Sequence, residues 1–381
     1  MAYLLDIATA VPEFTVSKEE LVEFYYKALG SMGSNSIKQK LTFLNEKTKI
    51  QKRYSCIPDF NMVDYELFAN ENFNQSIEKR TTIYKEKILP LASKAINKLF
   101  LKTNIKPKEI THLITVSCTG VFAPGFEFLV SEYYGLQHTE KLALNFLGCY
   151  AAIKALKHAK YIADANPDAC ILIICVELCS LHFLPSISDE DIVANLLFAD
   201  GAAATFVCGN KNKHIEDNII LKIDEIGSSY IPNTLELMTW NISSSAFRMH
   251  LNKNIVNEIK DNIYPVVTNF LKGNKPSYWA IHPGGVRIVE VVKDSLSLNE
   301  NDIEDSMSVL QQHGNMSSPT ILFVLKKILN KIKFAEHIEN KNIFSCAFGP
   351  GLSVEMISLT AVNTSHSNRL YNIKKSHAIE S

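Results

Sequence analysis

Three side chains of this 381-residue sequence are of types that act together in acyl-group chemistry. Cys149 in "NFLGCYAAI" stands where a strand-like run changes to a helical pattern, and the amides at a helix start lower a thiol pKa. His282 in "YWAIHPGG" ends an expected strand, and loops at strand ends are where catalytic side chains concentrate. These positions predict a nucleophile and its proton partner. A buried structural thiol and a histidine satisfied by a backbone carbonyl remain the alternatives.

The third residue is Asn315, in "QQHGNMSSPT". An amide does not ionise, so its N–H₂ group stays a donor at any pH and suits an oxygen that becomes negative. A helix cap is the alternative, but Ser317 and Ser318 offer hydroxyls nearer the following helix, where Ser318 fits the N-cap and Pro319 the first turn. We therefore predict an oxyanion donor at Asn315 and a structural role for its neighbour His313.

The rest of the chain alternates short runs rich in Ile and Val with longer amphipathic segments. This pattern predicts an α/β fold in which helices cover interior sheets. Helical patterns span 150–167 and 319–332. The expected strands are 112–118, 141–147, 170–178, 202–209, 278–282 and 343–349.

Two pairs of segments repeat each other weakly. "LGCYAAIKAL" is echoed by "HGNMSSPTIL", and "FADGAAATFV" by "FGPGLSVEMI". The echoes favour two similar halves, which we place at 1–215 with the cysteine and 216–362 with the histidine and asparagine. Residues 363–381 are polar, and we expect a loose tail there.

Composition argues against several classes of protein. Lys and Arg total 39 and Asp and Glu 40, without the basic excess of a nucleic-acid binder. The most apolar stretch, 169–185, is interrupted by Glu177 and too short to span a bilayer. The first residues lack the positive start and unbroken apolar core of a secretory signal, so we expect a soluble, cytoplasmic protein.

Cysteine spacing and the known short motifs point to no metal or cofactor. None of the eight cysteines forms a CxxC pair, and we expect most to be buried reduced thiols. Cys170, Cys175 and Cys179 fit no zinc-finger spacing. Dinucleotide-binding, phosphate-binding, GxSxG and HExxH motifs are absent from the sequence.

Several motifs together resemble the type III polyketide synthases, the chalcone-synthase-like enzymes. "LGCYAA", "AIHPGG", "HGNMSS" and "FGPGLSVE" occur in that order. "ATAVP" near the start, "KTKIQKRY" (47–54), "CTGVFAPG" (118–125), "VELCSLHF" (176–183) and "LFADGAAA" (197–204) match as well. The resemblance runs from about residue 3 to 360 and is closer to bacterial than to plant members.

The resemblance implies a thiolase-like fold with duplicated halves in five αβαβα layers, usually as a homodimer, with CoA thioesters as substrates and no metal or other cofactor. It implies that a starter acyl-CoA acylates Cys149, whose thiolate His282 activates. His282 and Asn315 would then hold the thioester oxygen of malonyl-CoA while CO₂ leaves. Phe198 and Phe247 match the two gatekeeper phenylalanines between the CoA tunnel and the cavity.

The resemblance also implies further binding positions, several of which depart from the family pattern. Lys40 and Lys47 match residues on the CoA phosphates, but Phe43 stands where an arginine is usual. Ala347 replaces the first glycine of the usual "GFGPG". Together with the departures at Phe43, Cys179, His182 and Met238, this change means that a plant-like chalcone product is not expected. The remaining positions expected to bind substrate are Cys118, Thr119, Ser317, Cys179 and His182, the last two being threonines in plant enzymes, and Met238 at a small-glycine position.

We therefore predict an acyltransferase that condenses a starter acyl-CoA with several malonyl-CoA units and cyclises the product to a phenolic or pyrone ring. A β-ketoacyl synthase III, with one condensation and a carrier protein, is the nearest alternative. A papain-like Cys-His-Asn hydrolase is more distant, because no "CGSCW"-like pattern surrounds Cys149. A noncatalytic acyl-binding protein would need no intact nucleophile. The starter, the number of extensions and the ring-closing mode stay open.

Overall fold

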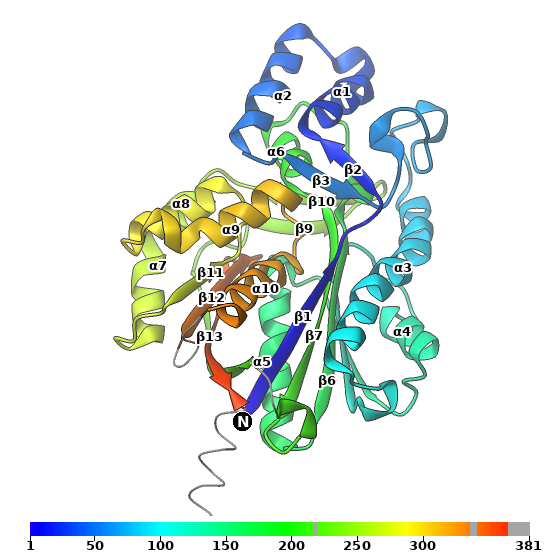
Figure 1. Ribbon diagram of the computed structural model, residues 1–381. Helices are drawn as coiled ribbons and strands as arrows, with labels where there is room; N and C mark the ends of the chain where they lie inside the picture. Colours follow the sequence, from blue (N-terminus) through cyan, green and yellow to red (C-terminus); the bar gives the residue numbers. More distant parts are fainter. Residues whose placement is uncertain (217–218, 336–340, 365–381) are drawn as a thin grey trace, which may run out of the picture.

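A computed structural model describes residues 1–216, 219–335 and 341–364 of the chain (Figure 1). Within these ranges no helix has the length and apolar character needed to cross a membrane. The strands are β1 (Ala2–Ala10), β2 (Phe14–Ser17), β3 (Lys52–Ser55), β4 (His112–Ser117), β5 (Glu140–Asn145), β6 (Cys170–Leu178), β7 (Asp200–Gly209), β8 (Ile219–Tyr230), β9 (Met238–Ile242), β10 (Phe247–Leu251), β11 (Tyr278–Ile281), β12 (Asn342–Gly349) and β13 (Ser353–Asn363). The α-helices are α1 (Lys18–Leu29), α2 (Asn35–Lys47), α3 (Ile77–Thr103), α4 (Phe126–Tyr134), α5 (Ala151–Ala165), α6 (Asp189–Leu197), α7 (Ile255–Leu271), α8 (Val286–Ser295), α9 (Glu300–His313) and α10 (Thr320–Lys333).

The main sheet is built from two runs of strands with the same local topology. Its order is β11-β12-β13-β8-β1-β7-β6-β4-β5. In the first run β1 pairs antiparallel with β7, β7 antiparallel with β6, and β6 parallel with β4. In the second run β8, β13, β12 and β11 repeat this pattern. The two runs meet through the short β1–β8 pairing, so the sheet contains a duplication, as expected from the sequence echoes.

Side chains alternate between the two faces of each strand, and this alternation builds five layers. In β6, Leu172 and Ile174 join a core under α1 and α3, whereas Ile171 and Ile173 join a core with α5 and α10. That second core also receives Ile357 and Leu359 of β13. The far face of β12 packs against α7, α8 and α9. Helices α5 and α10 therefore lie between the two halves of the sheet, and other helices cover the outside.

The expected elements are confirmed within about two residues at most ends. All six predicted strands are present, as β4, β5, β6, β7, β11 and β12, and the two predicted helices are α5 and α10. The division near residue 215 stays a prediction. Strand β13 runs through Asn363, the first residue assigned to the tail, and 365–381 lie outside the described residues.

All eight cysteines lie within the described residues, and each has a free thiol, as predicted. Cys170 and Cys175 of β6 belong to cores on opposite faces of the sheet. They therefore do not point into one common site.

Candidate active site

Cys149 lies in the turn that leads into α5, as the sequence predicts. A 3₁₀ turn, Gly148–Tyr150, precedes the helix, and only 7% of Cys149 is exposed. Gly148 has a φ of +76°, and a Cβ there would lie 2.7 Å from Cδ of Pro350 in the "FGPG" segment. Phe146 also has a positive φ, of 59°, which is a strained backbone for a bulky residue. The turn that contains Cys149 is thus shaped by close contact with the second half of the chain.

Asn315 uses its two amide ends differently. Its Oδ1 accepts a hydrogen bond from the Ser317 N–H at 2.8 Å, which is a local turn contact. Its Nδ2 donates to the Gly284 carbonyl at 3.3 Å and lies 3.9 Å from Sγ of Cys149. Asn315 therefore does not cap α10, which begins at Thr320 without a side-chain cap, and the local bond on its oxygen aims the donor end at the thiol.

The main chain of Asn315 is held by the segment that follows α6. Its N–H donates to the Leu197 carbonyl, and its carbonyl accepts from the Ala199 N–H, each at 2.9 Å. Together they form an isolated parallel bridge between Phe198 and Asn315. The predicted oxyanion donor is thus fixed beside a predicted gatekeeper.

His282 follows β11 and is almost completely buried, with 1% of its surface exposed. Its main chain is bonded to Cys346 of β12, yet neither ring nitrogen has a hydrogen-bond partner among the described residues. The ring lies against Gly284, where an added Cβ would stand 3.9 Å from Nε2. Since Gly284 accepts the bond from Asn315, the imidazole and the amide share one neighbour. The predicted bond between His282 and the Cys149 thiol is not formed in this structure.

The ionisation of these groups differs from the expectation. Burial raises the pKa of the Cys149 thiol to about 11, although hydrogen bonds from Ser317 and Asn315 oppose part of the rise. The predicted lowering of this pKa is therefore wrong here, because burial outweighs what the helix start supplies. Burial also lowers the pKa of His282 to about 3. Burial thus favours the neutral form of both the Cys149 thiol and the His282 imidazole. Transfer of one proton from the thiol to the imidazole would create an ion pair without net charge.

Glu177 is a buried carboxyl group beside the site that sequence reasoning missed. Its Oε2 accepts bonds from the Cys118 N–H at 2.8 Å and the Thr119 hydroxyl at 2.9 Å. Its Oε1 accepts from the Ser318 hydroxyl at 2.5 Å. Burial raises the pKa of Glu177 to about 7 in spite of these donors. The sequence did contain a signal for this residue, because Glu177 is the one carboxylate in the otherwise apolar stretch 169–185.

The bond to Glu177 also corrects the predicted N-cap at Ser318. Helix α10 starts at Thr320 after Pro319, and its first turn has no side-chain cap. The Ser318 hydroxyl bonds the buried carboxyl group instead. A buried carboxyl group needs hydrogen-bond donors from the protein, because water cannot supply them.

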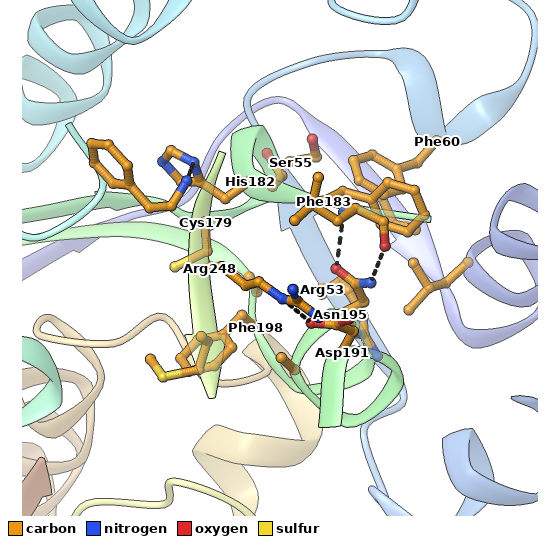
Figure 2. A pocket seen from close by; sticks show the side chains of 18 of the residues that line it. Arg53, Ser55, Phe60, Cys179, His182, Phe183, Asp191, Asn195, Phe198 and Arg248 are labelled. Carbon is orange, nitrogen blue, oxygen red and sulfur yellow. Dashed lines mark hydrogen bonds and ion pairs between the residues drawn. The ribbon is translucent and has the colours of Figure 1, made fainter. Parts of the chain in front are cut away.

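A cavity lies beside the two predicted gatekeepers, and Figure 2 shows many of its side chains. Phe198, Cys179 and His182 line one part of it, together with Phe247. Arg53, Asn195 and Asp191 line another part. The structure thus brings four of the predicted substrate-binding residues to one cavity, next to the bridge that holds Asn315.

The other predicted binding residues are not among those that line this cavity. Sγ of Cys118 accepts a hydrogen bond from the Gly148 N–H at 3.0 Å, so it contacts the turn that contains Cys149. Ser317 is buried with a left-handed backbone, φ 57°, and Thr119 bonds Glu177. Met238 begins β9 and is not among the residues that line the cavity.

Both lysines predicted for CoA lie on α2. Lys40 forms an ion pair with Asp189 at the start of α6. The ammonium group of Lys47 lies 5.2 Å from the ring centre of Phe43, whose side chain is 59% exposed. Phe43, which stands where the family usually has an arginine, therefore places its ring under the ammonium group of Lys47.

Comparison with known proteins agrees with this arrangement. Residues 1–211 match the N-terminal domain of chalcone and stilbene synthases, and residues 222–363 match the C-terminal domain. PKS-I from the brown alga Ectocarpus siliculosus is 27% identical with a TM-score of 0.88, covering 95% of this chain and 99% of that one. The type III polyketide synthase domain of Steely1 from Dictyostelium is 25% identical with a TM-score of 0.85, covering 95% and 99%.

CsyB, solved with CoA-SH, shares the fold at 22% identity and a TM-score of 0.85, covering 95% of this chain and 100% of that one. The two family matches together span most of the sequence. The chain therefore belongs to the chalcone and stilbene synthase family, has the thiolase-like fold, and is a type III polyketide synthase, an acyltransferase that works by decarboxylative condensation.

Proposed function

We propose that this enzyme loads a starter acyl-CoA on Cys149, extends it repeatedly with malonyl-CoA, and closes the chain to a phenolic or pyrone ring. The observation that carries this proposal is the paired donor site beside the thiol. His282 is buried, its ring nitrogens have no hydrogen-bond partner within the part of the chain that the structure describes, and the Asn315 amide is aimed at Cys149 Sγ. Buried polar groups without partners are rare in folded proteins, and a catalytic role is one of the explanations for them.

Loading begins with transfer of the thiol proton to His282. The thiolate then attacks the thioester carbonyl of the starter, the C–S bond to CoA breaks, and CoA leaves with a proton. The raised pKa of Cys149 makes a free thiolate scarce at neutral pH. In this scheme the thiolate forms together with imidazolium, as a pair whose charges compensate each other.

Extension requires neutral donors on the malonyl thioester oxygen. When the carboxylate leaves as CO₂, its electron pair forms an enolate, and the oxygen becomes negative. An amide N–H and an imidazole N–H stabilise that oxygen without supplying a proton readily. The lowered pKa of His282 keeps the imidazole neutral once CoA has left. The enolate carbon then attacks the acyl group on Cys149 and releases the sulfur.

Phe198 and Phe247 would exclude water from this carbanion. Phe198 is bridged to Asn315, and the Phe247 ring packs 5.1 Å from that of Phe146 beside the nucleophile's turn. Apolar walls this close to the reacting carbon reduce quenching by solvent. No metal or further cofactor takes part in the proposed steps.

We also propose a cytoplasmic homodimer that recognises CoA through Lys40 and Lys47. Strand β5 forms one end of the sheet, and its outer edge, which pairs with no other described strand, is available to a second copy. Sedimentation equilibrium tests the dimer, since a monomer at micromolar concentration would exclude it. Alanine at Lys47 should raise KM for acyl-CoA but not for the matching N-acetylcysteamine thioester, and an equal change for both would contradict the phosphate contact.

The reaction itself is tested with malonyl-CoA labelled in the carboxyl carbon and a panel of starter CoAs. We expect release of labelled CO₂ and, with a suitable starter, an extended product detected by mass spectrometry. Cys149→Ala should form no acyl-enzyme and no extended product. Normal product formation by that variant would refute the nucleophile assignment. One condensation only, with any starter, would favour a β-ketoacyl synthase III-like activity.

A further inference from the structure

Both ring nitrogens of His182 are bonded to main-chain groups from two different parts of the chain. Nε2 donates to the Thr119 carbonyl at 2.7 Å, and Nδ1 accepts from the Phe247 N–H at 3.1 Å. This pattern fixes the neutral tautomer with its proton on Nε2. His182 lines the cavity, yet it has no free ring nitrogen with which to bind or protonate a substrate.

The His182 ring also packs against the gatekeeper that it bonds. Its centre lies 4.5 Å from that of Phe247, with the two planes 10° apart. Phe146 packs on Phe247 at 5.1 Å, and Trp240 meets it edge-on at 6.0 Å. Phe247 is therefore enclosed by three rings that come from separate segments.

Trp240 makes a second link between the same two parts of the chain. Its Nε1 donates to the Cys118 carbonyl at 2.7 Å, next to the carbonyl that His182 holds. Trp240 lies on β9 and Phe247 on β10, and these two strands form a separate two-stranded sheet. Two consecutive carbonyls beside the nucleophile's turn are thus connected to this hairpin.

We propose that His182 and Trp240 latch the β9–β10 hairpin to residues 118–119 and thereby position Phe247 so that decarboxylation stays coupled to chain extension. This role rests on the proposed function. A displaced Phe247 admits water to the enolate, which then takes a proton at carbon. Malonyl-CoA and one proton then yield acetyl-CoA and CO₂, and no carbon–carbon bond forms. His182 is thus a positioning residue for the gate.

The test measures how malonyl units divide between acetyl-CoA and extended product. His182→Leu removes both hydrogen bonds, and His182→Gln retains one donor and one acceptor. We expect the acetyl-CoA share to rise about five-fold or more in the leucine variant and to stay within about two-fold of wild type in the glutamine variant. This share does not depend on how much enzyme is folded, so a general loss of stability leaves it unchanged.

His138→Leu is the matched control. His138 lies in the turn between α4 and β5, and its ring also bonds a main-chain carbonyl, that of Ile110, at 3.0 Å. Its acetyl-CoA share should equal that of wild type. Trp240→Phe removes only the second link and carries the test if His182→Leu does not fold. A wild-type share in both His182→Leu and Trp240→Phe would overturn the latch. Absence of CO₂ release by the wild type would instead refute the proposed function.

Discussion

Asn315 and Phe198 are joined by an isolated parallel bridge, so the predicted oxyanion donor and one gatekeeper share a main-chain connection. Both hydrogen bonds of the bridge are 2.9 Å long. A shift of the segment after α6 would therefore move the donor and the cavity wall together. If both residues have their proposed roles, decarboxylation and the exclusion of water are linked through this bridge.

Replacing Asn315 by alanine should separate the two half-reactions. The amide is aimed at the site where the enolate oxygen forms, so CO₂ release should fall by about 100-fold or more. Starter loading should change much less, because Cys149 and His282 are retained. Labelled CO₂ measures the first step, and acyl-enzyme formation by rapid-quench mass spectrometry measures the second. Equal losses in both steps would remove Asn315 from its proposed role.

The reactivity of Cys149 should keep rising at alkaline pH. Its pKa is raised to about 11, so the thiolate fraction should grow by about ten-fold per pH unit between pH 7 and pH 10. Peptide mass spectrometry after timed iodoacetamide treatment gives the alkylation rate at each pH. A rate that levels off below pH 8 would show that Cys149 already exists as a thiolate, paired with His282.

Glu177 should make stability decrease as pH rises from acid to neutral. Its folded pKa is about 7 against an ordinary 4.5, so the folded protein retains a proton that the unfolded chain loses. This contribution is complete below pH 4.5 and disappears as pH passes 7, which amounts to about 3 kcal/mol. Urea unfolding of wild type and Glu177→Gln at pH 4.5 and pH 8 measures it, since contributions of other groups cancel in the comparison. The same change in the free energy of unfolding between the two pH values in both proteins would contradict the raised pKa of Glu177.

Alanine at Gly148 should destabilise the protein more than alanine at Gly135. Both glycines have positive φ, +76° and +69°, but only Gly148 has an atom within 4 Å of the added Cβ, namely Cδ of Pro350 at 2.7 Å. The clash should cost about 1–3 kcal/mol beyond the backbone strain that the two variants share. Urea unfolding of both variants gives this difference. An equal loss would mean that the Pro350 contact adjusts without cost.

The fold was largely predictable because its central strands are buried on both faces. Every residue of β6 and β7 is buried, and such strands appear as unbroken apolar runs. Strand β8 carries Lys222, Asp224 and Glu225 among its apolar residues, and the sequence analysis did not identify it. Its neighbours β1 and β13 are far away in sequence, so the pairing that stabilises it leaves no local pattern.

The places of the candidate site residues in the fold were predictable, but their ionisation and bonding were not. Cys149, Asn315 and His282 stand out at the ends of elements, which a sequence displays directly. The raised pKa of Cys149 depends on burial by distant segments. The bonds of His182 reach residues 63 and 65 positions away, so a side chain expected to bind substrate instead connects the segment after β4 to the start of β10.

The contact between Gly148 and Pro350 can form only late in the synthesis of the chain. The proline follows the glycine by about 200 residues, which at ~5–20 residues per second takes roughly 10–40 s on the ribosome. Throughout that interval the nascent chain holds its thiol without the proline that shapes the turn. His282 and Asn315 are also synthesised long after Cys149. The proposed catalytic site is therefore complete only when the last strands have been made.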